Sequence, residues 1–276
     1  DSGEIIVGVA IRSPAPTVGG ADTIDAGTGA DRIIAGTGAD AVTAGNGDNI
    51  VLGDSGEIVF GSTTLRSLAS ADAAGDVIAT GTGRDWIVAG AGADSVDSGR
   101  GNDVILGDTG VLEAENGLPQ RALADTSAGA GDVIDAGAGT EWILGGRGGD
   151  TILNAAGRAV ILGDAGEIRA DAQGRVALVR SVDPGTGGDD RITGSDAADW
   201  VIAGTGADNV ASNNGPDVLL GDTGRIVATA GIRRTAIADE APGGADLLDA
   251  GAGSEWIPGG AAGDTILNPS GRSSIL

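Results

Sequence analysis

The strongest constraint on the fold is a nine-residue sequence that recurs in phase along the chain. Residues 28–54 read TGADRIIAG, TGADAVTAG and NGDNIVLGD. Each copy has Gly-x-Gly before an acid or amide, and an apolar residue two places after it. The glycines permit a tight turn, and the apolar residue is the centre of a short strand. Since such a strand is not stable alone, the copies must stack at about 4.8 Å.

Two successive copies, 18 residues, predict one coil with a turn on each side. Turns two copies apart then lie over one another, so that Asp22 stacks on Asp40 and Asp85 stacks on Asp103. Stacked carboxylates repel each other unless a cation lies between them. Ca²⁺ fits best, because the turns also offer backbone carbonyls and because Mg²⁺ prefers a stricter octahedron. Zn²⁺ is disfavoured, since the chain has no His and no Cys.

Residues 35–43, AGTGADAVT, match the pattern G-G-x-G-x-D-x-U-x except at its first glycine. In this the chain resembles the RTX, or hemolysin-type, calcium-binding nonapeptide repeats, which form a parallel β-helix. The resemblance implies an all-β fold, a right-handed parallel β-roll or β-solenoid of stacked nonapeptide turns. It also implies type I secretion and calcium-dependent folding outside the cell.

The motif Gly-Asp-x-Gly divides the array into five units of about 55 residues. Its aspartates are Asp54, Asp108, Asp164 and Asp222. We expect one continuous repeat array with units 1–53, 54–107, 108–163, 164–221 and 222–276, the last of them truncated. Because residues 1–5 have the same sequence as residues 54–58, we expect the array to continue beyond both ends.

Each unit begins with a spacer of about 20 residues that lacks the nonapeptide pattern. In several spacers two β-like runs flank a turn such as Asn116-Gly117 or Gln173-Gly174, which is typical of a β-hairpin. A protruding hairpin and a wider coil both fit, because the spacer length is close to that of one coil.

Four nonapeptides follow in each unit and place turn acids in four columns. The first and third columns are complete, whereas the fourth has Ala159 and Ser273 in the units whose second column has Glu141 and Glu255. We therefore predict weak calcium binding, or none, between Glu141 and Ala159. The remaining sites predict about eight to ten calcium ions. The predicted metal ligands are Asp22, Asp40, Asp76, Asp94, Asp132, Asp150, Asp190, Asp208, Asp246 and Asp264 on one side, and Asp31, Asp85, Asp103, Asp199 and Asp217 on the other.

Four tryptophans, Trp86, Trp142, Trp200 and Trp256, directly follow the second-column acid, where the first unit has Arg32. The next residue of each repeat points inward, so we expect the indole rings to point outward. The favoured interpretation is that a spacer hairpin covers each ring. The alternative is an exposed aromatic ladder that contacts another protomer or a sugar.

The net charge of −24, from 40 acids and 16 bases, disfavours nucleic acid as a partner. Without Cys there are no disulfides, and no apolar run approaches the roughly 20 residues of a membrane-spanning helix. An enzyme is not expected, because His, Cys and Tyr are missing and because the acids repeat too regularly for one unusual catalytic pair.

The leading hypothesis is a calcium-binding structural region of an extracellular or cell-surface protein. An adhesin stalk, an S-layer protein and a filament subunit all fit it. Expected partners are calcium, other copies or neighbouring repeats joined end to end, and cell-surface glycans, without membrane insertion. Two alternatives are the C-terminal secretion and folding region of a type I secreted toxin or hydrolase, and a carbohydrate-binding surface built on the tryptophans.

Overall fold

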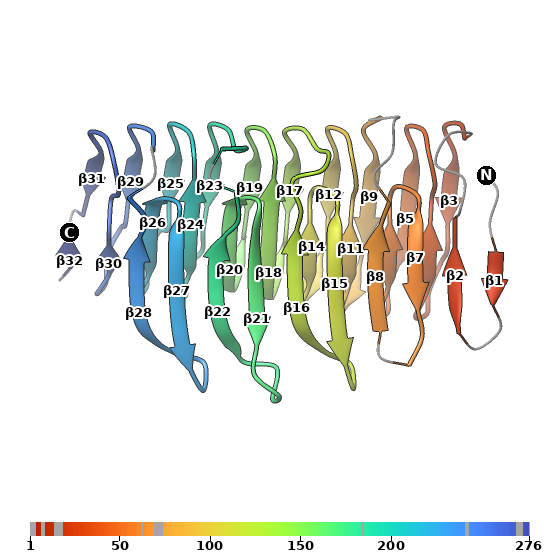
Figure 1. Ribbon diagram of the computed structural model, residues 1–276. Helices are drawn as coiled ribbons and strands as arrows, with labels where there is room; N and C mark the ends of the chain where they lie inside the picture. The colour runs from red at the N-terminus through yellow and green to blue at the C-terminus, as the bar shows by residue number, and fades with distance from the viewer. Residues whose placement is uncertain are drawn as a thin grey trace.

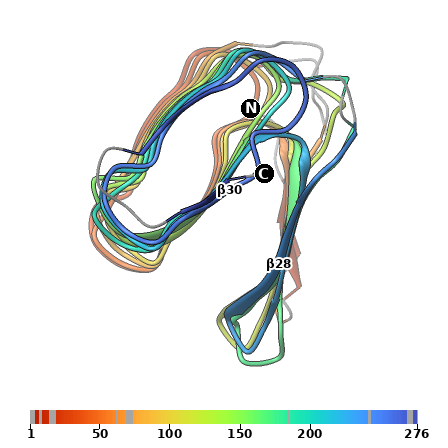
Figure 2. The same cartoon turned by 90° about the vertical axis from the view of Figure 1, so that its left-hand side faces the viewer.

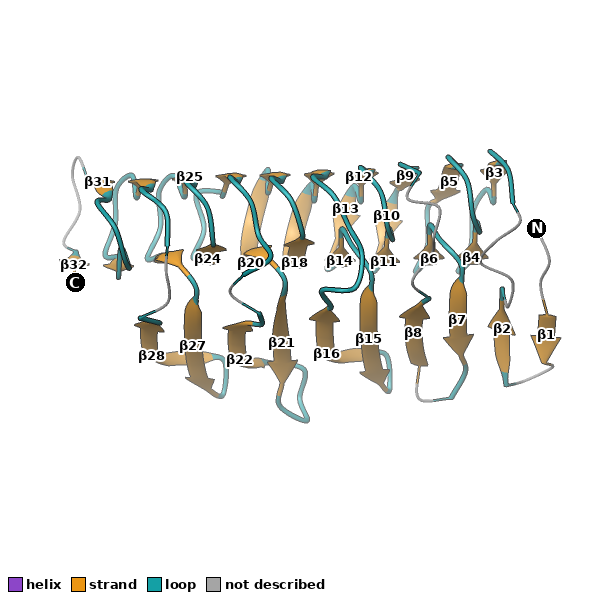
Figure 3. Ribbon diagram, turned by 45° about the horizontal axis from the view of Figure 1, so that its top comes forward, coloured by secondary structure: helices purple, strands orange, loops and turns teal. Residues whose placement is uncertain are grey.

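The nonapeptides stack as coils of an elongated β-roll, and a row of hairpins projects from one side of it (Figures 1 and 2). The computed structural model describes residues 4–6, 9–13, 19–61, 63–68, 74–183, 185–240, 243–268 and 273–275. Residues 1–3 and 276, on which the expected continuation of the array depends, lie outside these ranges. The described residues are all β and contain no helix that could span a membrane (Figure 3).

One wall of the roll is a ten-stranded parallel sheet, here called the outer sheet. Its strands carry one inward apolar residue each, such as Val42 or Ile134, between two more exposed neighbours. This alternation is typical of a strand with one buried face. The strands are β3 (Thr23–Asp25), β5 (Ala41–Gly45), β9 (Val77–Thr80), β12 (Ser95–Asp97), β17 (Val133–Asp135), β19 (Thr151–Leu153), β23 (Arg191–Thr193), β25 (Asn209–Ala211), β29 (Leu247–Asp249) and β31 (Thr265–Leu267).

The other wall is a twelve-stranded parallel sheet, here called the central sheet. Most of its longer strands read as short apolar runs, such as Trp86-Ile87-Val88, because both of their faces are buried. Ile87 pairs with Ile105, which confirms an 18-residue coil. The strands are β4 (Arg32–Ile34), β6 (Ile50–Leu52), β10 (Thr82–Gly83), β11 (Trp86–Val88), β13 (Arg100–Gly101), β14 (Val104–Leu106), β18 (Ala138–Gly146), β20 (Ala156–Asp164), β24 (Trp200–Gly204), β26 (Val218–Asp222), β30 (Trp256–Ile257) and β32 (Ser274–Ile275).

The spacers form hairpins, so a unit contains two coils and not three. Asn116 and Gly117, with φ of 53° and 73°, form the tight turn that their sequence predicts. Each hairpin also pairs with the next, which gives one ten-stranded antiparallel sheet, the hairpin sheet. Its strands are β1 (Glu4–Ile6), β2 (Ala10–Arg12), β7 (Gly56–Val59), β8 (Thr63–Ser67), β15 (Gly110–Glu115), β16 (Leu118–Ala124), β21 (Gly166–Ala170), β22 (Val176–Ser181), β27 (Gly224–Thr229) and β28 (Ile232–Ala238).

Each hairpin is inserted into one glycine turn without disturbing the coil below it. A Cβ atom added to Gly145 would lie 2.2 Å from Oδ2 of Asp150, which is five residues further along the same turn. A Cβ atom added to Gly107 would likewise lie 2.2 Å from Oδ2 of Asp132, although the β15–β16 hairpin separates the two residues in sequence. The coil therefore closes beneath the hairpin as if the hairpin were absent.

Two apolar cores run along the molecule. The inner core lies between the two parallel sheets and contains the centre residues of their strands, such as Ile87 and Ile105. The second core lies between the central sheet and the hairpins and contains Trp86, Trp142 and Trp200, each no more than 6% exposed. The covered-ring interpretation is thus confirmed for these tryptophans, and the exposed aromatic ladder is wrong, because the hairpin sheet lies over the indoles.

The hairpin sheet also contains a buried charge. Glu167 on β21 lies 2.5 Å from Arg121 on β16, 2.7 Å from Arg169 and 2.8 Å from Arg180 on β22. Burial opposes the charge of Glu167, but the hydrogen bonds from the three arginines outweigh it and lower its pKa to about 2. Glu167 thereby holds two neighbouring hairpins together.

The close stacking of the turns gives a first prediction, the effect of Gly137→Ala. Gly137 has a φ of +65°, and a Cβ atom there would lie 1.6 Å from the carbonyl oxygen of Gly99 in the preceding coil. We expect the added methyl group to push two coils apart and to cost about 2 kcal/mol or more of the free energy of unfolding. The measurement is the thermal midpoint in saturating calcium. Gly20→Ala is the matched control, since a Cβ atom there meets nothing within 4 Å.

Candidate metal centre

Ten aspartates form a continuous ladder along one edge of the roll, here called the first ladder. In each step the backbone N–H of one aspartate donates to Oδ1 of the aspartate in the next coil. The N–H of Asp22 donates to Asp40 at 2.7 Å, and that of Asp132 donates to Asp150 at 2.7 Å. The ladder also continues from Asp40 to Asp76, at 2.8 Å, past the β7–β8 hairpin. Its members are Asp22, Asp40, Asp76, Asp94, Asp132, Asp150, Asp190, Asp208, Asp246 and Asp264.

The second carboxylate oxygen of most of these aspartates is buried and has no hydrogen-bond partner. Burying an oxygen of this kind is costly unless something satisfies it. Asp22 is exposed and Asp264 is half-buried, so the buried oxygens without partners occur only in the interior of the ladder. The oxygens are the Oδ2 atoms of Asp40, Asp76, Asp94, Asp132, Asp150, Asp190, Asp208 and Asp246.

Burial also disfavours the charged form of these carboxyl groups when no cation is near. Burial and then the charge of Asp190 raise the pKa of Asp150 to about 10. Burial, together with neighbouring acids, raises the pKa of Asp132 and of Asp190 to about 9. A bound cation reverses this preference, because it stabilises the ionised carboxylate.

Asn49 shows what kind of group the turns accept. It lies at a position where Asp85 and Asp103 lie in the next two coils, and its side-chain Nδ2 donates to the carbonyl oxygens of Gly45 and Gly47 at 3.0 Å each. The turn carbonyls thus converge on a positively polarised group. Where an aspartate occupies this position, its second oxygen cannot donate a hydrogen bond. A cation is then needed between this oxygen and the two turn carbonyl oxygens.

The donor set is all oxygen and largely backbone. In the described part of the chain no group of three or more acids converges on one point. An ion held here would therefore combine one or two carboxylates with turn carbonyls, which are the hard ligands that Ca²⁺ takes in flexible geometry. The aspartates of the first ladder would supply the carboxylates, and the ion would neutralise their oxygens.

The second ladder lies on the opposite edge of the roll and is irregular. The N–H of Asp85 donates to Asp103 at 2.8 Å, and that of Asp103 donates to Oε2 of Glu141 at 2.7 Å. The chain of bonds then stops, because Ala159 has no acceptor to offer, and it resumes where the N–H of Ala159 donates to Asp199 at 2.7 Å. The members are Asp31, Asn49, Asp85, Asp103, Glu141, Ala159, Asp199 and Asp217.

At the interrupted part of the second ladder, Asp199 has protein partners for both carboxylate oxygens, whereas Oε1 of Glu141 and Oε1 of Glu255 are buried without a hydrogen-bond partner. Oδ2 of Asp199 accepts the N–H of Ser195 at 2.7 Å, so both of its oxygens are bonded. The guanidinium group of Arg158, next to Ala159, lies 4.6 Å from the Trp200 ring, and burial lowers its pKa although the Asp199 charge opposes this shift. Glu255 accepts hydrogen bonds from Asn268 and Ser273. Weak or absent calcium binding between Glu141 and Ala159 stays a prediction, which rests on the missing acid at Ala159.

Restoring the missing acid gives a second prediction. The double variant Glu141→Asp/Ala159→Asp reproduces the arrangement of Asp85 and Asp103. We expect it to bind one additional calcium ion and to raise the thermal midpoint in calcium by a few degrees. Ion content by atomic spectroscopy and the midpoint by circular dichroism would check this. In chelator the same variant should be less stable than the parent, because it adds a buried carboxylate.

A further set of buried carboxylates was not predicted as part of the site. Asp108 accepts the N–H of Ala130 at 3.2 Å and the N–H of Arg147, and so ties the end of one hairpin to the turn of the next coil. Burial raises the pKa of Asp108 to about 8, although the two hydrogen bonds lower it. Asp164 and Asp222 make equivalent contacts. The regular Gly-Asp-x-Gly motif is the sequence signal for these carboxylates, which lie at the unit boundaries.

The comparisons with known proteins agree with this geometry. The family model of the RTX calcium-binding nonapeptide repeat matches in four copies, at residues 17–57, 70–105, 128–152 and 184–224, which together cover more than half of the chain. The third match ends before Ala159, where the second ladder is interrupted. No curated protein and no solved structure matches the chain.

Proposed function

The chain belongs to the RTX calcium-binding nonapeptide repeat family, and we propose from this premise that it is a structural region of a secreted, cell-surface protein that folds and stiffens on binding calcium. The observation that carries the proposal is the line of buried, unpartnered carboxylate oxygens in the first ladder. We propose all fifteen aspartates named from the sequence as ligands and about eight to ten ions per chain.

The mechanism couples binding to folding. Without calcium the stacked carboxylates oppose the coil arrangement, and a chain with 53 glycines gains much entropy on unfolding. Calcium at the millimolar level that extracellular sites require converts binding free energy into folding free energy. The polypeptide is thus exported unfolded and becomes rigid outside the cell.

The continuity of the fold favours a structural role over a catalytic one. The first ladder, the hairpin sheet and both cores pass through the units without interruption, as expected of a stalk, a layer or a filament segment. The array joins end to end with neighbouring repeats or with other copies. The second candidate, a secretion and folding region of a toxin or hydrolase, is less well supported, because such a region does not need paired hairpins.

Circular dichroism during a calcium titration from chelator upward tests the proposal, with Trp emission recorded in parallel. We expect a cooperative gain of β signal together with a blue shift, because folding buries Trp86, Trp142 and Trp200 beneath the hairpins. Magnesium at the same concentration is the control and should be much less effective. A complete β signal in chelator, with no bound ions by atomic spectroscopy, would refute the proposal.

A further inference from the structure

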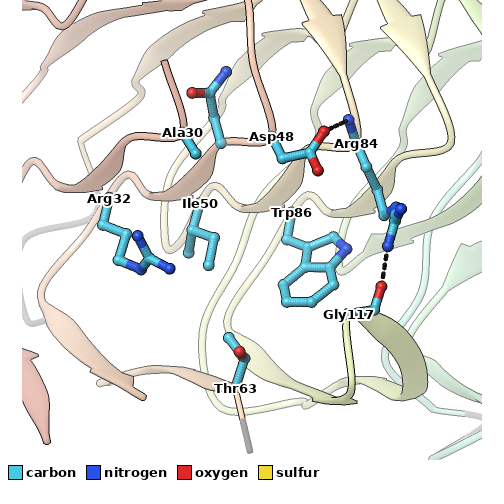
Figure 4. A pocket seen from close by; sticks show the side chains of 9 residues that line it. Ala30, Arg32, Asp48, Ile50, Thr63, Arg84, Trp86 and Gly117 are labelled. Carbon is cyan, nitrogen blue, oxygen red and sulfur yellow. Dashed lines mark hydrogen bonds between the residues drawn. The ribbon is translucent and has the colours of Figure 1, made fainter. Parts of the chain in front are cut away.

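Two neighbouring pockets lie in the crevice between the central sheet and the hairpin tips. The first has a volume of about 260 Å³ and is shown in Figure 4. The second has a volume of about 310 Å³. Arg84 lines both of them and lies at their boundary. The polar lining is Arg32, Asp48, Asn49, Thr63 and Trp86 in the first, and Asn102, Asp103, Thr140 and Trp142 in the second.

The two pockets are built in the same way. In the first, Oδ1 of Asp48 accepts the N–H of Arg84 at 2.9 Å. In the second, Oδ1 of Asn102 accepts the N–H of Thr140 at 3.0 Å. Each pocket also has a tryptophan in its wall and one hairpin-tip glycine, Gly117 or Gly174. The repeat of the sequence thus gives two neighbouring pockets with similar walls.

The first pocket contains donors that the protein leaves unused. Trp86 is 6% exposed, and its Nε1 atom is buried without a hydrogen-bond partner. The guanidinium group of Arg84 donates to the carbonyl of Gly117, and that of Arg32 lies 5.3 Å from the Phe60 ring. Neither arginine forms an ion pair with another described residue. Both therefore keep N–H groups for a ligand, in a chain whose net charge is −24.

We propose that the two pockets together bind an acidic oligosaccharide. Guanidinium groups match a carboxylate in bidentate geometry, and the indole N–H adds a donor at the wall. The carboxylate of Asp48 and the amide of Asn102 can accept hydrogen bonds from sugar hydroxyls, and Asp48 makes a purely anionic ligand such as phosphate a poorer fit. A neutral sugar would form no ion pair with either arginine.

The distance between the pockets suits a short sugar chain. Trp86 on β11 and Trp142 on β18 are separated by one strand, β14, and thus by about 10 Å along the roll. A chain of a few sugars spans this distance, with one ring in each pocket and a carboxylate at Arg84 between them. This site does not use the faces of the indole rings, which the hairpins cover. It depends on the proposed function only because the chain must be folded in calcium.

The test is a titration of the ¹⁵N-labelled full chain, held at constant free calcium, with a glucuronic acid tetramer. Each tryptophan gives one indole N–H resonance, assigned with single Trp→Phe variants. We expect the resonances of Trp86 and Trp142 to shift and those of Trp200 and Trp256 to stay unchanged. Arg84→Gln and Arg32→Gln should each weaken binding at least about tenfold. Arg158→Gln, at an arginine outside both pockets, is the matched control and should bind normally.

Several outcomes would overturn the site. They are the absence of any shift, equal shifts with a neutral glucose tetramer, and equal shifts with acetate at the same carboxylate concentration. Unchanged affinity in both Arg84→Gln and Arg32→Gln would have the same meaning. Circular dichroism of the same samples confirms the calcium-loaded fold, so that a failure of the sugar site is distinguishable from a failure of calcium-dependent folding.

Discussion

In the absence of calcium, acidification is expected to increase the β structure of the chain, whereas in saturating calcium it is expected to decrease it. The calcium-free trend follows from the first ladder, where burial raises the pKa of Asp150 to about 10 and that of Asp132 to about 9 from the ordinary value of 3.8. A raised pKa in the folded state gives a stabilising contribution that is fully present below about pH 4 and is lost as the pH rises toward these values. Each pKa unit corresponds to about 1.4 kcal/mol.

In calcium the pH dependence of stability has the opposite sign, because the ion binds the ionised carboxylate and protons compete with the ion. Circular dichroism against pH, in chelator and in saturating calcium, gives two curves that should converge at acidic pH and diverge at alkaline pH. Glu167 acts in the opposite direction, because its pKa of about 2 gives a stabilising contribution that is lost as the pH falls below about 4.5, but it acts alike on both curves. Two curves with the same slope would contradict the assignment of the first ladder as the calcium site.

Replacing one buried acid by its amide, Asp150→Asn, is expected to stabilise the calcium-free chain and to destabilise the calcium-loaded chain. The introduced amide can still accept the N–H of Asp132 through its oxygen. Its NH₂ group can donate to the carbonyls of its own turn, as Asn49 does to Gly45 and Gly47. The buried charge is thus removed without loss of the ladder, but the carboxylate that would hold an ion is removed too.

The size of the effect depends on how many ions Asp150 helps to bind. At a calcium concentration one hundred times the dissociation constant, each lost site costs about 2.7 kcal/mol of the free energy of unfolding. The β signal by circular dichroism in chelator, the thermal midpoint in calcium and the bound-ion count together measure both halves of the prediction. Asp25→Asn removes the same charge from the exposed face of β3 and should change neither quantity. A variant with unchanged ion content would show that Asp150 is not a ligand.

The coil arrangement could be predicted from the sequence because the residues that define it recur at a fixed spacing. Val42 and Ile87 each lie two places after a turn acid, Asp40 and Asp85, and Asp85 and Asp103 recur at the coil length of 18 residues. The hydrogen bonds from Asp22 to Asp40 and from Asp85 to Asp103 confirm the predicted stacking. The calcium interpretation rested on the same regularity.

Other features are formed by residues with no common period. The first ladder passes from Asp40 to Asp76 across a spacer, and only the closed coil under the hairpin shows that these residues are neighbours. The pairing of one hairpin with the next, as between Arg121 and Glu167, joins spacers of different sequence and length. Burial of the tryptophans depends on where the spacers lie, so the sequence favours a covered ring without excluding the exposed alternative.

The insertion of one hairpin for every two coils determines which changes in length the protein tolerates. Deleting nine residues would exchange the two walls, so that the apolar strands of the central sheet would occupy the solvent-facing wall. Deleting eighteen residues would prevent one hairpin from pairing with the next, because the pairing of β8 with β15 requires two coils between them. Deleting a whole unit preserves all three sheets. Duplication and unequal recombination should therefore change such arrays in steps of one unit, and relatives of different length should differ by whole multiples of it.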